Sequence, residues 1–108
     1  MTASDIDWSK KEQEIAKTVL KNAYLRETRA LIEEVRQRAS SMAELDEIWH
    51  LHDFLSARRH DLDGKYDDRY SGILFVFARL MKEGWLHLEE LEGLDTDKLT
   101  KVGALSRM

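Results

Sequence analysis

The fold is decided by residues 9–40, which read SKKEQEIAKTVLKNAYLRETRALIEEVRQRAS. Ser9 and Glu12 match a Ser-x-x-Glu capping box, in which the hydroxyl and the carboxylate each accept a main-chain N–H that would otherwise be unpaired. Apolar residues then recur every three or four positions, which is the spacing of one helical face: Ile15, Val19, Ala23, Leu31, Val35 and Ala39. The stretch predicts one helix that begins at Ser9 and reaches Ala39 or Ser40 without a break.

The composition of the whole chain also favours helices. Its 108 residues include no proline and only five glycines, the two residue types that most disfavour helix interiors. A chain of this length can bury a core that folds without metal or disulfide bonds, and it contains no cysteine. We therefore expect one all-α domain over residues 1–108, with a long helix at about 9–40 and a smaller helical head at about 41–108.

The length of the first helix predicts an arm that extends beyond its own core. A helix of about 31 residues is roughly 46 Å long, whereas a compact chain of this size is only about 34 Å across. Ile32 also points about 100° away from Leu31 on a helical wheel, so the helix presents apolar side chains on two sides. A bent helix packed on its own core would account for this, but we prefer a homodimer that buries Leu31, Ile32 and Val35.

A second helix is expected after residue 40. Ser41 and Glu44 match another capping box, and Asp63–Gly64 predicts the turn that ends the helix, because glycine accommodates the positive φ that turns often require. Phe54 projects from an otherwise polar side of this helix, which indicates that this side has a packing neighbour.

The third helix is expected to start at a cap formed by Asp67 or Asp68 and to stop at Gly84. Its apolar residues define a clear core face, and Phe75 lies about 160° from the centre of that face. We therefore expect Phe75 to be exposed, where it could anchor a protein partner.

The remaining residues predict a short element ending near Gly93 and a last helix capped by Asp95 or Thr96. That helix carries Leu99, Val102 and Leu105 as core residues, with Lys98 and Lys101 near its polar side.

The charge pattern argues against several classes of function. The net charge is −4, and lysine and arginine are scattered among acids, whereas nucleic-acid binding usually needs a basic stripe. The N-terminal residues lack the pattern of a secretory signal, and no segment approaches the roughly 20 apolar residues that span a bilayer. We expect a protein that does not span a membrane and whose partner is another protein.

The residues richest in functional side chains are 49–69, which read WHLHDFLSARRHDLDGKYDDR. His50 and His52 suggest a metal site, but histidines two apart on a helix diverge by about 200°, whereas helical zinc ligands are normally at i and i+4. His52 beside Asp53 and Arg59 suggests acid–base catalysis, but no nucleophile or phosphate-binding motif accompanies them. We prefer a recognition surface anchored by Trp49, Phe54 and Tyr66, because aromatic residues surrounded by charges are typical of binding hot spots.

The segments WHLHDFLSARR at 49–59 and DGKYDDR at 63–69 closely resemble the signature of the cyanobacterial fluorescence recovery protein family. The resemblance covers essentially the whole chain and includes Trp8–Ser9, residues 75–78, Glu83–Gly84 and residues 104–108. It implies an all-helical protein without cofactor or enzymatic activity, which dimerises in antiparallel fashion through the long first helix with Ile32 at the contact.

The resemblance also implies a function and a binding surface. Members of the family bind the photoactivated red form of the orange carotenoid protein, mainly at its C-terminal domain. They hasten its return to the orange form and its release from the phycobilisome, which ends non-photochemical quenching. The implied partner-binding residues are Trp49, His52, Asp53 and Arg59, with contributions from Phe75 and Lys101.

The resemblance further implies a cytoplasmic protein, with peripheral association at the thylakoid surface as an alternative location. Relatives outside carotenoid-protein systems leave one other function open, a helical dimeric interaction module with a different protein partner.

Overall fold

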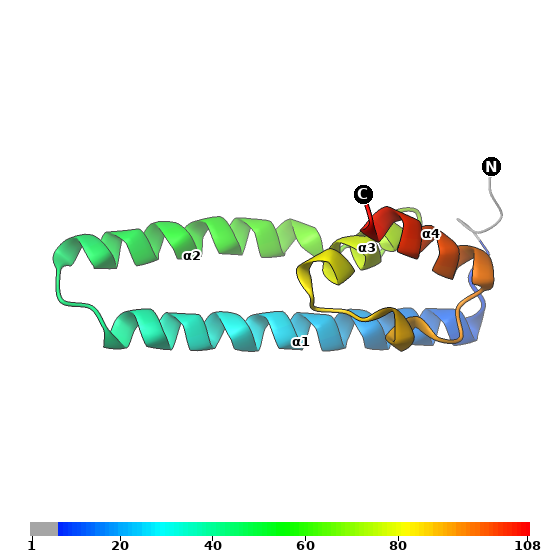
Figure 1. Ribbon diagram of the computed structural model, residues 1–108, viewed down its shortest axis with the longest axis horizontal. Helices are drawn as coiled ribbons and strands as arrows, with labels where there is room; N and C mark the ends of the chain where they lie inside the picture. The colour runs from blue at the N-terminus through cyan, green and yellow to red at the C-terminus, as the bar shows by residue number, and fades with distance from the viewer. Residues whose placement is uncertain (1–6) are drawn as a thin grey trace.

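The computed structural model describes residues 7–108, and all of the regular elements among these residues are helical (Figure 1). The elements in chain order are α1 (Lys10–Ser40), α2 (Leu45–Lys65), α3 (Ile73–Glu83), the short 3-10 helix η2 (Leu88–Leu91) and α4 (Thr96–Ser106). The all-α fold with a long N-terminal helix is therefore confirmed.

The capping box predicted at the start of α1 is present. The main-chain N–H of Glu12 donates to the Ser9 hydroxyl, and the N–H of Ser9 donates to the Glu12 carboxylate, both at 3.1 Å. From this cap α1 continues for 31 residues to Ser40, as the apolar spacing predicted.

The molecule is elongated, with extents of 55 × 24 × 24 Å. Figure 1 shows α2 running antiparallel to the second half of α1, while α3, η2 and α4 lie against its first half. We call α2 together with α1 residues 28–40 the hairpin, and we call α3, η2 and α4 together with α1 residues 10–27 the core end.

The hydrophobic core is confined to the core end. On α3, Ile73, Leu74, Phe77 and Leu80 share one face and are at most 5% exposed, because their spacing of one and three residues follows the helical repeat. The other buried apolar residues come from the segment before α1, from α1, from α3, from the segment around η2, and from α4: Trp8, Ala16, Val19, Ala23, Ala78, Leu86, Leu91, Leu94 and Val102. In contrast, residues 28–64 contain no buried residue, so the hairpin has no core of its own.

The capping box predicted from Ser41 and Glu44 does not form, and α2 begins at Leu45. Ser41 belongs to the end of α1, where its hydroxyl donates to the main-chain oxygen of Arg38. The box that forms is instead at Glu47, whose carboxylate accepts the N–H groups of Ala43 at 2.7 Å and of Glu44 at 2.8 Å. These two bonds lower the pKa of Glu47.

The predicted turn at Asp63–Gly64 was also wrong, because α2 continues through both residues to Lys65. Glycine in a helix interior costs only about 1 kcal/mol relative to alanine. Continuing the helix brings the Lys65 ammonium to the buried carboxylate of Glu27 at 2.9 Å, and the chain leaves the helix at Tyr66.

Neither Asp67 nor Asp68 caps α3. Asp67 instead accepts the main-chain N–H of Arg69 at 3.0 Å and binds its guanidinium, and the N-cap residue of α3 is Gly72. The predicted end of α3 is confirmed, since Gly84 has φ +87°, a left-handed conformation that favours glycine.

Lys98 is not on the polar side of α4 as expected but is only 1% exposed. Its ammonium contacts both carboxylate oxygens of Glu12 at 3.0 Å and the main-chain oxygen of Asp7 at 2.7 Å. It also lies 4.6 Å from the centre of the Trp8 ring. The lysine therefore fastens the start of α1 to α4.

None of the helices formed by residues 7–108 combines the length and the apolarity that crossing a bilayer requires.

Candidate functional site

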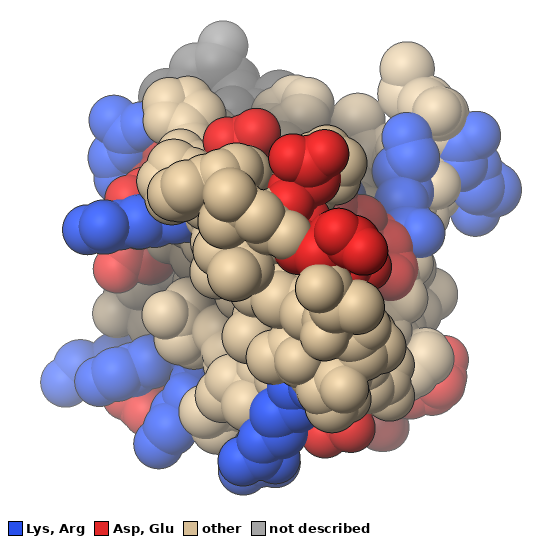
Figure 2. Space-filling model, turned by 90° about the vertical axis from the view of Figure 1, so that its left-hand side faces the viewer, with Lys and Arg blue, Asp and Glu red and all other residues tan. Residues whose placement is uncertain are grey.

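The outer face of α2 carries large apolar side chains that no other element covers. Trp49 is 56% exposed, and Leu45 and Ile48 are exposed to a similar extent. Figure 2 views the hairpin end of the molecule, and uncharged surface extends across this end with acidic groups beside it and cations toward its margins. An exposed patch of this kind is typical of a protein-interaction site.

Three of the predicted partner-binding residues share that face with Trp49. His52 and Asp53 follow Trp49 by one helical turn, and Arg59 follows His52 by two turns, so all four residues project to the same side of α2. The His52 and Asp53 side chains lie 3.3 Å apart and are both more than two thirds exposed. We call this group the Trp49 face, and its exposed rings and charges suit recognition of another protein.

The opposite face of α2 packs on α1. The Arg38 guanidinium lies 4.0 Å from the centre of the Phe54 ring, and Arg58 reaches the Glu27 carboxylate at 3.2 Å. The packing neighbour predicted for Phe54 is thus α1 itself. Phe54 and Tyr66, predicted as anchors beside Trp49, both contact α1 residues instead of sharing the outer face with Trp49. Because α1 occupies this side, the Trp49 face points away from the rest of the protomer.

The predicted dimer residues do not form a single uniform stripe. Ile32 is 52% exposed, whereas Leu31 and Val35 are half-buried. Tyr24 and Leu25 are also exposed on α1. Tyr24, Leu25 and Ile32 therefore form an apolar strip of α1 that is open to solvent.

Phe75 and Lys101 lie at the core end, on α3 and α4, whereas Trp49, His52 and Asp53 lie on the first half of α2, away from the core end (Figure 1). Phe75 is 58% exposed on α3, as its position on the helical wheel predicted, and Lys101 is half-buried on α4. The structure thus divides the six predicted partner-binding residues between α2 and the helices α3 and α4 of the core end.

A buried ionic cluster connects the hairpin to the core end, and the sequence analysis missed it. Glu27 is 1% exposed. Its carboxylate accepts from Tyr66 at 2.6 Å, from Lys65 at 2.9 Å and from Arg58 at 3.2 Å. Lys65 also contacts Glu83 of α3.

A signal for this cluster was present in the sequence. Glu27 lies four residues after Ala23 and four before Leu31, so it occupies a position on the apolar stripe of α1. Glu12 likewise lies four residues before Ala16. A carboxylate on a core stripe is expected to be buried and therefore paired with a cation.

Burial and pairing shift the pKa values of Tyr66, Glu83 and Asp61 in and beside this cluster. Burial, and then the hydrogen bond to Glu27, raise the pKa of the Tyr66 hydroxyl, so it remains a donor. Burial alone would raise the pKa of Glu83, but the hydrogen bonds from Lys65 and Arg79 outweigh it and the pKa is lowered. A hydrogen bond from Arg79 at 2.7 Å also lowers the pKa of Asp61.

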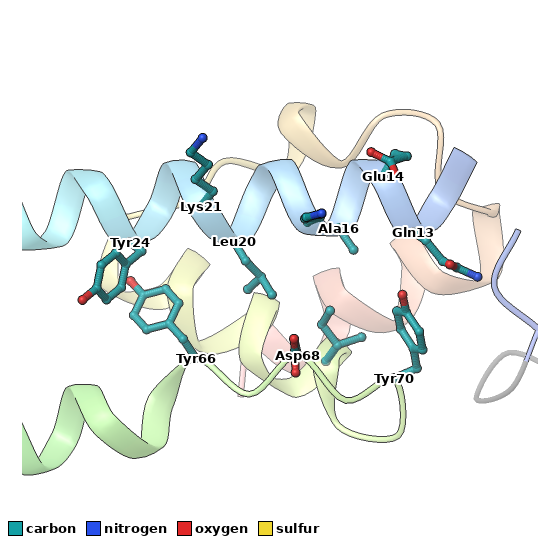
Figure 3. Close-up of a pocket in the computed structure, with 11 residues that line it drawn as sticks. Gln13, Glu14, Ala16, Leu20, Lys21, Tyr24, Tyr66, Asp68 and Tyr70 are labelled. Atoms are coloured by element: carbon teal, nitrogen blue, oxygen red, sulfur yellow. The ribbon is translucent and has the colours of Figure 1, made fainter. Parts of the chain in front are cut away.

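A hollow of about 490 Å³ lies between α1 and the segment that joins α2 to α3 (Figure 3). Tyr24 and Tyr66 meet edge to face at one end of it, with ring centres 5.2 Å apart, and Tyr70 stacks on Trp8 beyond the other end. The charged residues that line it are Glu14, Lys17, Lys21 and Asp68, whose charges cancel. The hollow therefore has no preference for a ligand of one charge.

Residues 7–108 include no group of three or more histidines and acids arranged to hold a metal ion. The side chains that gather at the surface are aromatic rings, aliphatic groups and exposed charges. Their arrangement suits non-covalent recognition of a protein.

Comparison with known proteins gives a consistent result. Residues 8–106 match the family model described as photoprotection regulator fluorescence recovery protein. The chain is 46% identical to the fluorescence recovery protein of Synechocystis sp. (strain ATCC 27184 / PCC 6803 / Kazusa) over 108 residues, which covers 100% of this chain and 99% of the relative.

Solved structures agree with the sequence matches. The fluorescence recovery protein of Fremyella diplosiphon superposes with a TM-score of 0.92 at 60% identity, over 94% of this chain and 100% of that chain. The protein from Synechocystis sp. PCC 6803 gives a TM-score of 0.91 at 50% identity, over 94% of this chain and 99% of that chain.

Proposed function

The chain belongs to the fluorescence recovery protein family of photoprotection regulators, and from this membership we propose that it acts on an orange carotenoid protein. It binds the photoactivated red form of that protein, mainly at the C-terminal domain. Binding hastens the return to the orange form and the release from the phycobilisome, which ends non-photochemical quenching. Family membership over the whole chain is the observation that carries this proposal.

The Trp49 face is the main contact with the carotenoid protein in this proposal. Trp49 supplies the apolar anchor, and His52, Asp53 and Arg59 supply the polar surroundings that fix its orientation. Their shared exposure on the outer side of α2 supports this assignment, because a hot spot combines a large ring with a charged rim. Phe75 and Lys101 form a second contact at the core end.

No bond is made or broken in the proposed activity. A binding protein accelerates a conformational relaxation only if it binds the transition arrangement more tightly than the starting form. Tight binding to the red form alone would slow recovery. Both proposed contacts must therefore strengthen as the two domains of the carotenoid protein approach each other.

The protein acts in the cytoplasm as a homodimer, with α1 of each protomer antiparallel to that of its partner. The absence of any buried residue in 28–64 supports the dimer, because a helical hairpin without a core is marginal in water. A second copy placed against α1 would cover Ile32 and bring Leu31 and Val35 into a shared apolar layer.

The test is recovery of the orange form in the dark, measured by absorbance after a pulse of strong light. The protein is expected to accelerate recovery of a purified orange carotenoid protein severalfold. Trp49→Ala is expected to lose most of the acceleration, since truncating a hot-spot aromatic typically costs 2 kcal/mol or more, about a thirtyfold loss of affinity. Leu88→Ala, which removes another exposed apolar side chain from η2, is the matched control and keeps wild-type acceleration.

An unchanged recovery rate with wild-type protein contradicts the proposal. In that case the exposed faces belong to a helical dimeric interaction module with a different protein partner.

A further inference from the structure

Two guanidinium groups lie over the Phe54 ring on the side of α2 that faces α1. The guanidinium carbon of Arg38 is 4.0 Å from the ring centre, and that of Arg58 is 6.0 Å from it. Arg38 belongs to α1, whereas Arg58 lies one turn after Phe54 on α2. Because a cation is attracted to the face of an aromatic ring, Phe54 joins the two helices through a directional contact.

Both guanidinium groups are also bonded to carboxylates of α1. Arg38 donates to Glu34, one turn earlier on the same helix, at 2.8 Å. Arg58 donates to the buried carboxylate of Glu27 at 3.2 Å. A continuous series of contacts therefore begins on α1 at Glu34, crosses the Phe54 ring and returns to α1 at Glu27. We call Arg38, Phe54 and Arg58 the clamp.

The other contacts of the hairpin do little to fix the rotation of α2 about its own axis. Residues 28–64 contain no buried residue, and contact between half-buried apolar side chains is non-directional. Lys65 bonds Glu27 at 2.9 Å, but it holds only the last turn of α2, and Trp49 lies about four turns earlier. A guanidinium is planar and rigid, so the clamp is suited to select one rotation.

The clamp and the Trp49 face lie on opposite sides of the same helix. Successive residues are about 100° apart around the axis, so Phe54 is about 140° from Trp49 and about 140° from Arg59. A rotation of α2 that moves Phe54 away from Arg38 turns the Trp49 face by the same angle. The contacts on the inner side therefore determine where the outer side points.

We propose that Phe54 is a positioning residue for partner recognition, because its ring, held by Arg38 and Arg58, fixes the rotation at which α2 presents the Trp49 face. The proposal rests on the proposed function, and it assigns Phe54 no contact with the partner. Without the ring, α2 samples several rotations, of which only a fraction presents the face correctly. The apparent affinity then falls in proportion to that fraction.

Spin labels can report the rotation of α2 in the free protein. The chain contains no cysteine, so Arg36→Cys and Ala57→Cys, at exposed positions on α1 and α2, introduce two defined labels. Labelled protein is diluted with unlabelled protein, so that double electron–electron resonance measures the distance within one protomer.

Phe54→Leu keeps an apolar side chain but removes the ring, and it is expected to broaden the distribution of distances between the labels. Phe54→Tyr keeps the ring face and should keep the distribution narrow. Phe75→Leu makes the same replacement at an exposed phenylalanine outside the hairpin and should leave the distances unchanged. Melting temperatures show that each variant is folded.

Recovery of purified orange carotenoid protein in the dark is then measured over a range of concentrations of each variant. Phe54→Leu is expected to raise the concentration for half-maximal acceleration about fivefold, which corresponds to roughly 1 kcal/mol for one cation–π contact. The maximal acceleration should be retained, because at saturation enough protein with the competent rotation is present. Phe54→Tyr should behave like wild type. Arg38→Gln removes the α1 cation at a partly exposed position and should act as Phe54→Leu does.

A narrow distance distribution in Phe54→Leu overturns the proposal even if affinity falls, since the ring would then contact the partner directly. A broadened distribution with wild-type half-saturation also overturns it, because the rotation of α2 would not govern recognition. Failure of Phe54→Tyr to restore wild-type behaviour contradicts the role of the ring face. If the wild-type protein does not accelerate recovery, the proposed function fails instead, and the distances, measured without the partner, still test the clamp.

Discussion

The carboxylate of Glu27 connects three segments of the chain at the point where the hairpin meets the core end. It receives donors from α2, through Arg58 and Lys65, and from the turn, through Tyr66. A buried charge is tolerated only while its partners are in place, since removing one partner leaves the others desolvated and unpaired. The cluster therefore sets the angle at which α2 leaves the core end.

Glu27→Gln is expected to lower the free energy of unfolding by about 3 kcal/mol, because it leaves the buried Lys65 ammonium with only Glu83 as a charged partner. Urea denaturation at pH 7 measures the change. Glu33→Gln is the matched control, since Glu33 pairs with Arg36 at 3.8 Å on the surface and such pairs contribute under about 1 kcal/mol. Equal changes in the free energy of unfolding for the two variants would show that the Glu27 cluster does not stabilise the fold more than a surface ion pair does.

At the scale of the elements, two glycines differ in whether their backbone and surroundings would accept a side chain. Gly64 lies inside α2 with no atom within 4 Å of the position that a Cβ would take. Gly93 has φ +107°, and a Cβ there would lie 2.6 Å from Cδ1 of Ile15. Only the second position requires glycine, both for its backbone conformation and for its closeness to α1.

Gly64→Ala is expected to raise the free energy of unfolding by about 0.5–1 kcal/mol, because alanine favours a helix interior. Gly93→Ala is expected to lower it by more than about 1 kcal/mol, because φ is positive and the methyl group would displace Ile15. Thermal unfolding of the two variants side by side measures both signs. A stabilising Gly93→Ala would mean that the segment after η2 can move away from α1.

The dimer contact that we propose lies on the α1 part of the hairpin. Ile32→Glu is expected to shift the molar mass measured by light scattering from dimer toward monomer, because the dimer would bury an uncompensated carboxylate. Ile32→Leu keeps the apolar volume and should keep the dimer. If Ile32→Glu remains dimeric, the contact between protomers lies on another face.

At the scale of the whole molecule, paired carboxylates tie α1 to η2 and α4, and α2 to α3. Burial alone would raise the pKa of Glu12, but hydrogen bonds from the main chain of Asp95 and Ser9 and from Lys98 outweigh it and lower the pKa. The hydrogen bond from Arg26 to Glu90 outweighs the effect of burial and lowers the pKa of Glu90. Hydrogen bonds from cationic side chains likewise lower the pKa values of Asp61 and Glu83.

These shifts predict loss of stability in acid. A carboxyl whose pKa is lowered in the folded state takes up a proton at higher pH when the chain is unfolded. The stabilisation is therefore fully present above the unfolded values of about 4–4.5 and is lost as pH falls through the lower folded values. Urea midpoints should be similar at pH 7 and 5 and should fall steeply between pH 4 and 3. A midpoint that stays constant down to pH 3 would contradict this account.

The sequence by itself determined the helical class, the capped 31-residue α1, the core face of α3, the stop at Gly84 and the exposure of Phe75. These features follow from local periodicity, capping chemistry and composition, which act over a few residues. The signature at 49–69 likewise identified the family, because those two segments are specific.

Only the tertiary structure decided where α2 ends, that Lys98 and Glu27 are buried, and that the six predicted partner-binding residues are divided between α2 and the helices α3 and α4 of the core end. The physical reason is that each depends on groups distant in sequence. Lys65 extends α2 past Gly64 toward a carboxylate 38 residues earlier, and Lys98 is drawn inward by Glu12, 86 residues away. The contacts of the Phe54 ring have the same origin, since Arg38 lies over it only when α2 packs on α1.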